Sequence, residues 1–170
     1  MRYIFENGNS NKDQPKKNNS NYTFWMNSIL RRSKEIGNVE LPICAIILDE
    51  GGRCIGRGVN RRNINKDPLG HAEIMALKQA SLIKNDWRFN ECTIITNLEP
   101  CTMCTSALIQ ARMGKVIFGA YDKKRGGLGG SIDLSKHKSS HHKMEIIGGI
   151  LEEECSKILQ LCFKKLRTQK

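Results

Sequence analysis

Two short stretches decide how this chain folds and which chemistry it carries: His71-Ala72-Glu73 and, further along, Pro100-Cys101-Thr102-Met103-Cys104. One imidazole and two thiols are ligands that suit zinc. A catalytic zinc site keeps three protein ligands and leaves the fourth position to water, whereas a structural site is normally closed by four. We therefore predict that His71, Cys101 and Cys104 bind Zn²⁺, and that Glu73, two residues after the histidine, is the catalytic proton carrier.

The residues around both stretches predict helix starts. Residues 72–80 are mostly strong helix formers without Gly or Pro, so the histidine and the glutamate fall in the first turn of a helix. Pro100 favours a second helix start, from Cys101 to about Arg112. The two cysteines are three residues apart and share a face of that helix, whose positive dipole end favours thiolates. Two facing helix N-termini would bring the three ligands around one ion.

The combined pattern, H-x-E followed by P-C-x-x-C, is the signature of zinc-dependent nucleobase deaminases. Cys-x-x-Cys alone is much weaker, because it also occurs in redox pairs and in structural zinc sites. A structural site would need a fourth ligand, for which Cys92 is the nearest candidate. Cys92 opens an apolar stretch typical of a buried strand, so we assign it to the core. We assign four further cysteines to the core as well: Cys44, Cys54, Cys155 and Cys162.

Length and charge narrow the class of protein. The 170 residues suit one domain, and no apolar run approaches the roughly 20 residues of a membrane helix. Seven cysteines without a secretory signal favour a reducing compartment, which we expect to be the cytoplasm. The net charge of +11 suits a polyanionic partner such as RNA, although a merely solvated basic surface remains the alternative. The candidate RNA-binding residues form two clusters: Lys123, Lys124 and Arg125, and Lys164, Lys165 and Arg167.

The order of predicted elements indicates an α/β fold. Residues 1–20 are polar and predicted to be a disordered extension, which leaves residues 21–170 as the zinc-dependent domain. We expect helices at residues 22–36, 71–80, 101–112 and 151–167, and strands at 43–48, 54–59, 93–97, 116–118 and 145–147. A glycine-rich segment at 126–130 is predicted to be a loop. Helices and strands alternate from the third strand on, so we predict a three-layer α/β/α sheet with helices on both faces.

The stretch from Trp25 to Arg167 resembles the bacterial tRNA-specific adenosine deaminases of the TadA type, within the cytidine-deaminase-like superfamily. The resemblance is carried by Asp67-Pro68-Leu69-Gly70-His71-Ala72-Glu73-Ile74-Met75-Ala76-Leu77, Leu98-Glu99-Pro100-Cys101-Thr102-Met103-Cys104 and Val116-Ile117-Phe118-Gly119-Ala120, with shorter matches at Val59-Asn60-Arg61 and Gly149-Ile150-Leu151-Glu152. It implies a homodimer with one Zn²⁺ per subunit, acting on a tRNA anticodon stem-loop.

The resemblance also implies roles for individual residues. Asn60, Ala72 and Asp122 correspond to positions that contact the substrate, although Asn60 would also serve as a plain turn residue. Phe163 corresponds to a frequent aromatic of the last helix, and a core role fits it equally well. The chain departs from the family pattern at Leu69-Gly70, Asn97 and Tyr121. These departures bear on the details of RNA contact and leave the predicted zinc ligands intact.

The implied reaction is hydrolytic deamination of adenosine to inosine at the wobble position, by a zinc-activated water with Glu73 as the proton shuttle. One alternative is deamination of a free base or nucleoside of the guanine or cytosine type, which the high positive charge disfavours. Another is a non-catalytic, zinc-stabilised RNA-binding module, in which Glu73 would have no use.

Overall fold

The computed structural model describes residues 19–36 and 40–168; the side chains of residues 19, 20, 163 and 165–168 lie outside that description. The elements follow in the order α1 (Asn19–Ile36), β1 (Cys44–Leu48), β2 (Cys54–Val59), α2 (Arg62–Asn65), α3 (Ala72–Lys84), β3 (Thr93–Leu98), α4 (Thr102–Gln110), β4 (Lys115–Ala120), the 3₁₀ turn η1 (Leu134–Lys136), β5 (Glu145–Ile147) and α5 (Glu152–Thr168).

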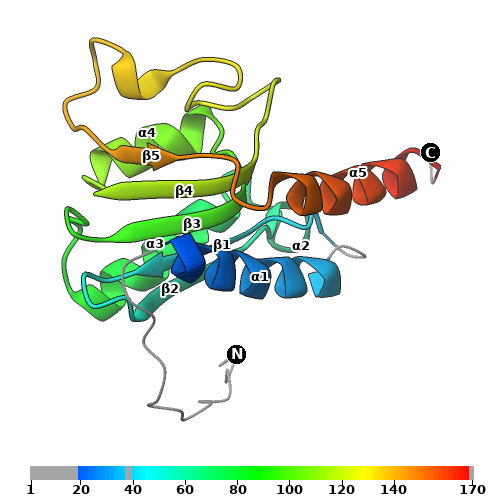
Figure 1. The fold of residues 1–170 in the computed structure, drawn as a ribbon, viewed down its shortest axis with the longest axis horizontal. Helices are drawn as coiled ribbons and strands as arrows, with labels where there is room; N and C mark the ends of the chain where they lie inside the picture. The colour runs from blue at the N-terminus through cyan, green and yellow to red at the C-terminus, as the bar shows by residue number, and fades with distance from the viewer. Residues whose placement is uncertain (1–18, 37–39, 169–170) are drawn as a thin grey trace.

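The strands form one mixed sheet in the order β2-β1-β3-β4-β5 (Figure 1). β1 runs antiparallel to both β2 and β3, whereas β3, β4 and β5 are parallel to one another. Helices α3 and α4 cover one face, and α1 and α5 cover the other. The predicted three-layer α/β/α architecture is confirmed.

Helix α3 lies very close to the sheet because small residues meet on both sides. Ala72, Ala76 and Ala80 are fully buried. Opposite them, a Cβ added to Gly58 would lie 1.8 Å from the carbonyl oxygen of Ala72, so only glycine fits there. This close approach sets the first turn of α3, which carries His71 and Glu73, against the end of β2.

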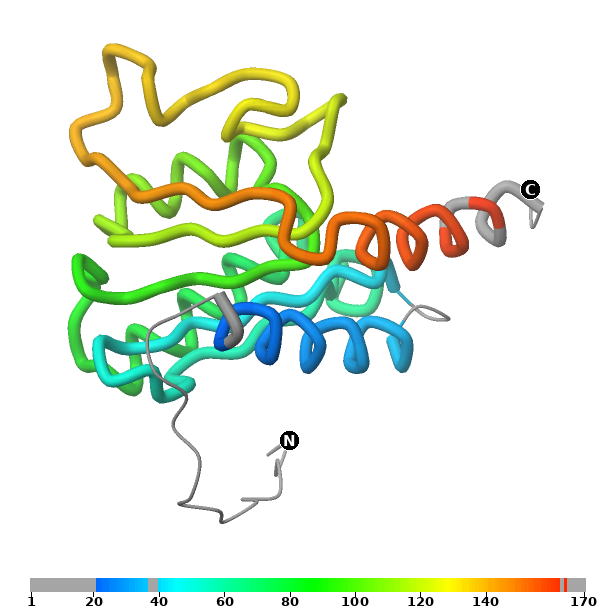
Figure 2. Tube along the Cα trace, in the orientation of Figure 1, coloured from blue at the N-terminus to red at the C-terminus, as the bar shows by residue number. Residues whose placement is uncertain are grey.

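The opposite face has its own core. Met26 and Ile29 of α1 and Leu159 of α5 are buried against the sheet residues Ile95 and Ile117. Figure 2 shows α1 and α5 running side by side along this face. The core cysteines are placed as expected, since Cys44, Cys92, Cys155 and Cys162 are buried and Cys54 is half-buried.

Three local features differ from the sequence expectations. Helix α1 begins at Asn19, so the last two residues assigned to the extension are helical, while residues 1–18 of that prediction lie outside the described residues. The expected loop after β2 contains the short helix α2, whose start is capped by the distant Glu40 carboxylate. The 3₁₀ turn η1 was not expected either. Among the described helices, none has the length and apolar character needed to cross a membrane.

Candidate active site at the starts of helices α3 and α4

The predicted metal ligands lie together at two helix starts. His71 and Cys101 are the N-cap residues of α3 and α4, each with extended backbone, and Cys104 lies in the first turn of α4. The Nδ1 atom of His71 is 3.5 Å from the Sγ of Cys101 and 3.4 Å from the Sγ of Cys104. The ligand atoms of all three residues lie within 4.8 Å of one another.

These distances fit a zinc ion. With Zn–N near 2.0–2.1 Å and Zn–S near 2.3 Å, a tetrahedron places nitrogen and sulfur about 3.6 Å apart, close to the two separations found here. Within the described part of the chain, this group of possible ligands has three members. Cys92 is not among them, because it is buried in the core between the sheet and α3. A donor set of three leaves one tetrahedral position for water or substrate, as in catalytic sites.

The surroundings of Cys101 favour the thiolate, whereas a hydrogen bond with Cys101 raises the pKa of Cys104. A hydrogen bond with Cys104 and a second with His71 lower the pKa of Cys101 to about 4. The same contact with Cys101 raises the pKa of His71. Cys101 is therefore poised as a thiolate, the form that binds metal.

Glu73 has the properties of a proton carrier. It lies in the first turn of α3 and is only 4% exposed. Burial raises its pKa to about 7. A carboxyl group with a pKa near the working pH can both accept and return a proton, which is what general acid–base catalysis requires.

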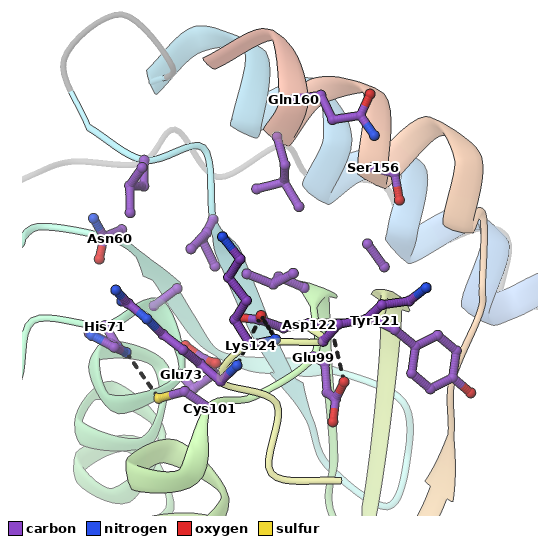
Figure 3. Close-up of a pocket in the computed structure, with 18 of the residues that line it drawn as sticks. Asn60, His71, Glu73, Glu99, Cys101, Tyr121, Asp122, Lys124, Ser156 and Gln160 are labelled. Atoms are coloured by element: carbon purple, nitrogen blue, oxygen red, sulfur yellow. Dashed lines mark hydrogen bonds between the residues drawn. The ribbon is translucent and has the colours of Figure 1, made fainter. Parts of the chain in front are cut away.

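A cavity of about 1300 Å³ opens over these residues (Figure 3). His71, Glu73 and Cys101 lie on one side of it, and Ser156 and Gln160 of α5 lie across from them. All three residues that the resemblance assigned to substrate contact line this cavity: Asn60, Ala72 and Asp122.

Known proteins with similar sequences show which family this chain belongs to. The sequence model of the cytidine and deoxycytidylate deaminase zinc-binding region matches residues 19–120. The chain is 36% identical to the tRNA-specific adenosine deaminase of Haemophilus influenzae over 131 residues, which cover 77% of this chain and 76% of that protein. It is 35% identical to the enzyme of the same name from Bacillus subtilis, covering 82% of this chain and 85% of that protein. The chain belongs to this deaminase family.

Solved structures agree with the assignment. A structure from work on A-to-I editing by tRNA:A34 deaminases superposes with a TM-score of 0.77 at 31% identity, covering 81% of this chain and 99% of that one. The guanine deaminase of Nitrosomonas europaea superposes with a TM-score of 0.65 at 17% identity, over 95% of this chain and 97% of that one. At that identity the second likeness shows the shared fold alone.

Asn60 is held in a fixed orientation at the cavity wall. It is 3% exposed, and its Nδ2 donates a 2.9 Å hydrogen bond to Oε2 of Glu40. Because a carboxylate oxygen only accepts, the atom facing it must be the amide nitrogen, and this settles which way the amide points. The other oxygen of Glu40 accepts from the backbone nitrogens of Asn63 and Ile64. Sequence reasoning missed Glu40, which lies too far along the chain from Asn60 for any local signal.

The cations predicted to bind RNA are only partly gathered at the cavity. Lys123, Lys124 and Arg125 are exposed and line its rim. Lys164 is exposed but does not line it, while the side chains of Lys165 and Arg167, and that of Phe163, lie outside the described residues. The structure adds Arg62 of α2 to the rim, which the basic pair Arg61-Arg62 beside Asn60 could have signalled.

The departures from the family pattern fall into two groups. Asn97 is fully buried and ties β3 to the start of β1, donating to the carbonyl oxygen of Pro42 and accepting from the backbone nitrogen of Cys44. This position therefore serves the fold and not RNA contact. Leu69 and Tyr121 are exposed, and Tyr121 lines the cavity with its ring packed edge-on against Phe118.

Proposed function

We propose that this protein deaminates adenosine to inosine at the wobble position of a tRNA anticodon. The observation that carries the proposal is a three-ligand metal site with a buried glutamate, set in a cavity whose rim bears exposed cations. Its family relatives are tRNA-specific adenosine deaminases, and the first solved structure named above concerns editing at the wobble position of transfer RNA.

His71, Cys101 and Cys104 would hold the zinc ion, which when bound would supply the Lewis acidity that lets a water molecule ionise near neutral pH. Glu73 accepts the proton released by that water and delivers it to N1 of the adenine ring, while the oxygen adds to C6. Glu73 then takes the remaining proton from the new C6 hydroxyl and passes it to the amino group, which leaves as ammonia while C6 becomes a carbonyl. The balance is water and adenosine in, inosine and ammonia out.

The cavity must receive a base that has left its stack. An anticodon loop is single-stranded, so splaying one nucleotide costs little. We propose that Asn60, Ala72 and Asp122 contact the entering nucleotide, with the amide of Asn60 held in orientation by Glu40. Lys123, Lys124 and Arg125 at the rim would meet the flanking phosphates, and Lys164, Lys165 and Arg167 remain candidates for contacts further along the RNA.

We further propose a cytoplasmic homodimer with one Zn²⁺ per subunit. The family resemblance supports this assembly. Large apolar side chains are also exposed in the last turn of α3 and just after it, as is common at protein contacts: Leu82, Ile83 and Trp87. Light scattering would give the mass in solution, and metal analysis would give the zinc content per chain.

A single assay separates the proposal from its alternatives. Purified protein is incubated with a tRNA carrying A34, with the same tRNA carrying G34, and with free adenosine, guanine and cytosine. We expect inosine in the A34 tRNA and ammonia in that reaction alone. Ammonia release from a free base at higher kcat/KM would assign the chain to the small-molecule deaminases. Tight tRNA binding without turnover by the zinc-loaded protein would indicate a non-catalytic module.

A further inference from the structure

The glycine-rich segment at residues 126–130 has no role in the chemistry described so far, yet it packs around one buried side chain. Glu99 precedes Pro100 and is 1% exposed. It also lines the cavity. A buried carboxylate is costly unless it is fully hydrogen-bonded.

The carboxylate of Glu99 is satisfied by backbone N–H groups from three places in the following loop. Its Oε1 accepts from the nitrogens of Leu128 and Gly130, at 2.8 and 2.9 Å. Its Oε2 accepts from the nitrogen of Asp122, at 3.0 Å, a bond drawn in Figure 3. One side chain therefore fixes both ends of the segment from 122 to 130.

The glycines are explained by the same contact. A Cβ added to Gly126 would lie 2.3 Å from the carboxyl carbon of Glu99, and one added to Gly130 would lie 2.1 Å from its Oε2. No other residue type allows the backbone to wrap this closely around the carboxylate. The glycines and the glutamate form one structural unit, although 23 to 31 positions separate Glu99 from the loop residues that contact it.

The same loop also positions residues at the rim of the cavity. Asp122, held by Glu99, accepts in turn from the backbone nitrogens of Lys124 and Arg125, at 2.9 and 3.1 Å. The position of the basic segment 123–125 thus depends on Asp122, and the position of Asp122 depends on Glu99. Backbone hydrogen bonds also hold the segment, from the nitrogen of Thr102 to the carbonyl oxygen of Arg125 and from the nitrogen of Gly127 to the carbonyl oxygen of Pro100, so the loop lies against the backbone on both sides of the ligand Cys101.

We propose that Glu99 is a positioning residue for RNA recognition, whose buried carboxylate holds the segment 122–130 so that Lys123, Lys124 and Arg125 stay at the cavity rim. The RNA part of this inference rests on the proposed function. Glu99 touches neither the reacting atoms nor the phosphates itself, so its effect falls on KM for tRNA and not on kcat.

The test compares Glu99→Gln with a matched control, Asp49→Asn. Asp49 also accepts from the backbone away from this cavity, because its Oδ1 accepts from the nitrogens of Gly51 and Arg53 in the β1–β2 turn, while its Oδ2 pairs with the Arg53 side chain. In each variant the new amide presents N–H donors where a carboxylate accepted. Three quantities are measured for both: zinc content, kcat and KM for the A34 tRNA, and hydrogen exchange of the backbone amides.

For Glu99→Gln we expect full zinc, nearly unchanged kcat, faster exchange at Leu128 and Gly130, and a rise in KM of about tenfold, the size expected for losing a hydrogen bond to a charged acceptor. Asp49→Asn should speed exchange only in its own turn and leave KM at the wild-type value. Loss of zinc from Glu99→Gln would overturn the proposal, because the residue would then support the neighbouring Cys101. An unchanged KM, or an equal rise in Asp49→Asn, would overturn it as well.

A second pair of variants keeps the proposal testable if Glu99→Gln folds poorly. Gly126→Ala places a methyl group against the carboxylate, and Glu99→Asp withdraws that carboxylate by one methylene. The double variant should lose less affinity for tRNA than the two single changes together, because the shorter side chain makes room for the methyl group. If the losses of tRNA affinity are additive, Gly126 and Glu99 are not energetically coupled.

The two proposals fail in distinguishable ways. If the wild-type protein does not form inosine in tRNA, the proposed function is wrong, whatever the variants do. Hydrogen exchange is measured without substrate. An unchanged exchange rate of the Leu128 and Gly130 amides in Glu99→Gln would therefore refute the holding role of Glu99, whether or not the variant deaminates tRNA.

Discussion

Two walls of the same cavity are built in different ways. The helix wall, formed by His71, Glu73, Cys101 and Cys104, takes its side chains from helix caps and first turns, whose backbone is fixed by regular hydrogen bonds. The loop wall, formed by Asp122, Lys123, Lys124 and Arg125, belongs to no helix or strand and is held by the side chain of Glu99 together with a backbone hydrogen bond from Thr102 to Arg125. The candidate chemical groups are thus positioned by secondary structure, whereas the groups that we propose to meet the RNA are positioned by contacts with a buried carboxylate and with backbone far away in the sequence.

The largest effect should come from removing a ligand of the helix wall. Cys101→Ala or Cys104→Ala should abolish both zinc binding and deamination and lower Tm, since metal binding is coupled to folding. Metal analysis and thermal unfolding check this. Cys92→Ala is the control, because it removes a buried thiol outside the ligand group and should retain its zinc. If Cys92→Ala loses zinc instead, the site is structural and the helix wall has been wrongly assigned.

Replacing Glu73 with glutamine should reduce the rate of deamination without reducing metal binding. We expect a normal zinc content and a fall in kcat of about 10²–10⁴-fold, the usual contribution of a general acid–base. Inosine formation in tRNA measures the rate. Glu152→Gln is a matched control, because Glu152 also lines the cavity but belongs to α5 and is exposed. Near-normal turnover in Glu73→Gln would remove this residue from the mechanism.

Replacing Lys123, Lys124 and Arg125 together with alanine should weaken the loop wall without harming the chemistry. KM for tRNA should rise and its dependence on salt should flatten by about 0.7 per lost phosphate contact, as for single-stranded nucleic acid. Zinc content and kcat should stay near the wild-type values. Kinetics over a range of salt concentrations would show this. An affinity that never depended on salt would leave these exposed cations without the role assigned here.

Deleting residues 1–18 should have the smallest effect, because this segment is polar and precedes the stretch that resembles the deaminase family. We expect unchanged kcat and Tm. KM should rise modestly at most, because the deletion removes Lys12, Lys16 and Lys17. Their attraction for phosphate acts equally on the ground state and the transition state. Steady-state kinetics of the truncated protein decide it. A large fall in kcat would mean that the segment reaches the active site.

Much of the helix wall could be predicted from the sequence. The motif residues sit at helix starts, where His71, Cys101 and Cys104 are fixed by local propensity and by Pro100, and the pairing of two such starts follows from the alternating fold. The strands at residues 54–59 and 145–147 also have the predicted bounds. Local patterns suffice in these places because the determinants lie within a few residues of one another.

The loop wall and its supports could not be predicted in this way. The glycines at 126–130 indicated only a loop, and nothing near them pointed to Glu99 as the group they enclose. The departure at Asn97 was expected to bear on RNA contact, whereas this residue is a buried link between β3 and the start of β1. Glu40, likewise, holds both Asn60 and the start of α2.

The sequence by itself thus determined the fold class and the basic character of this protein, and it predicted the candidate ligand set and proton carrier. Only the tertiary structure decided which cations stand at the cavity and which buried side chains hold them there. The physical reason is that a buried carboxylate or amide is stable only where backbone donors and acceptors converge on it. That convergence is created by chain segments far apart in sequence, once the sheet has brought them together.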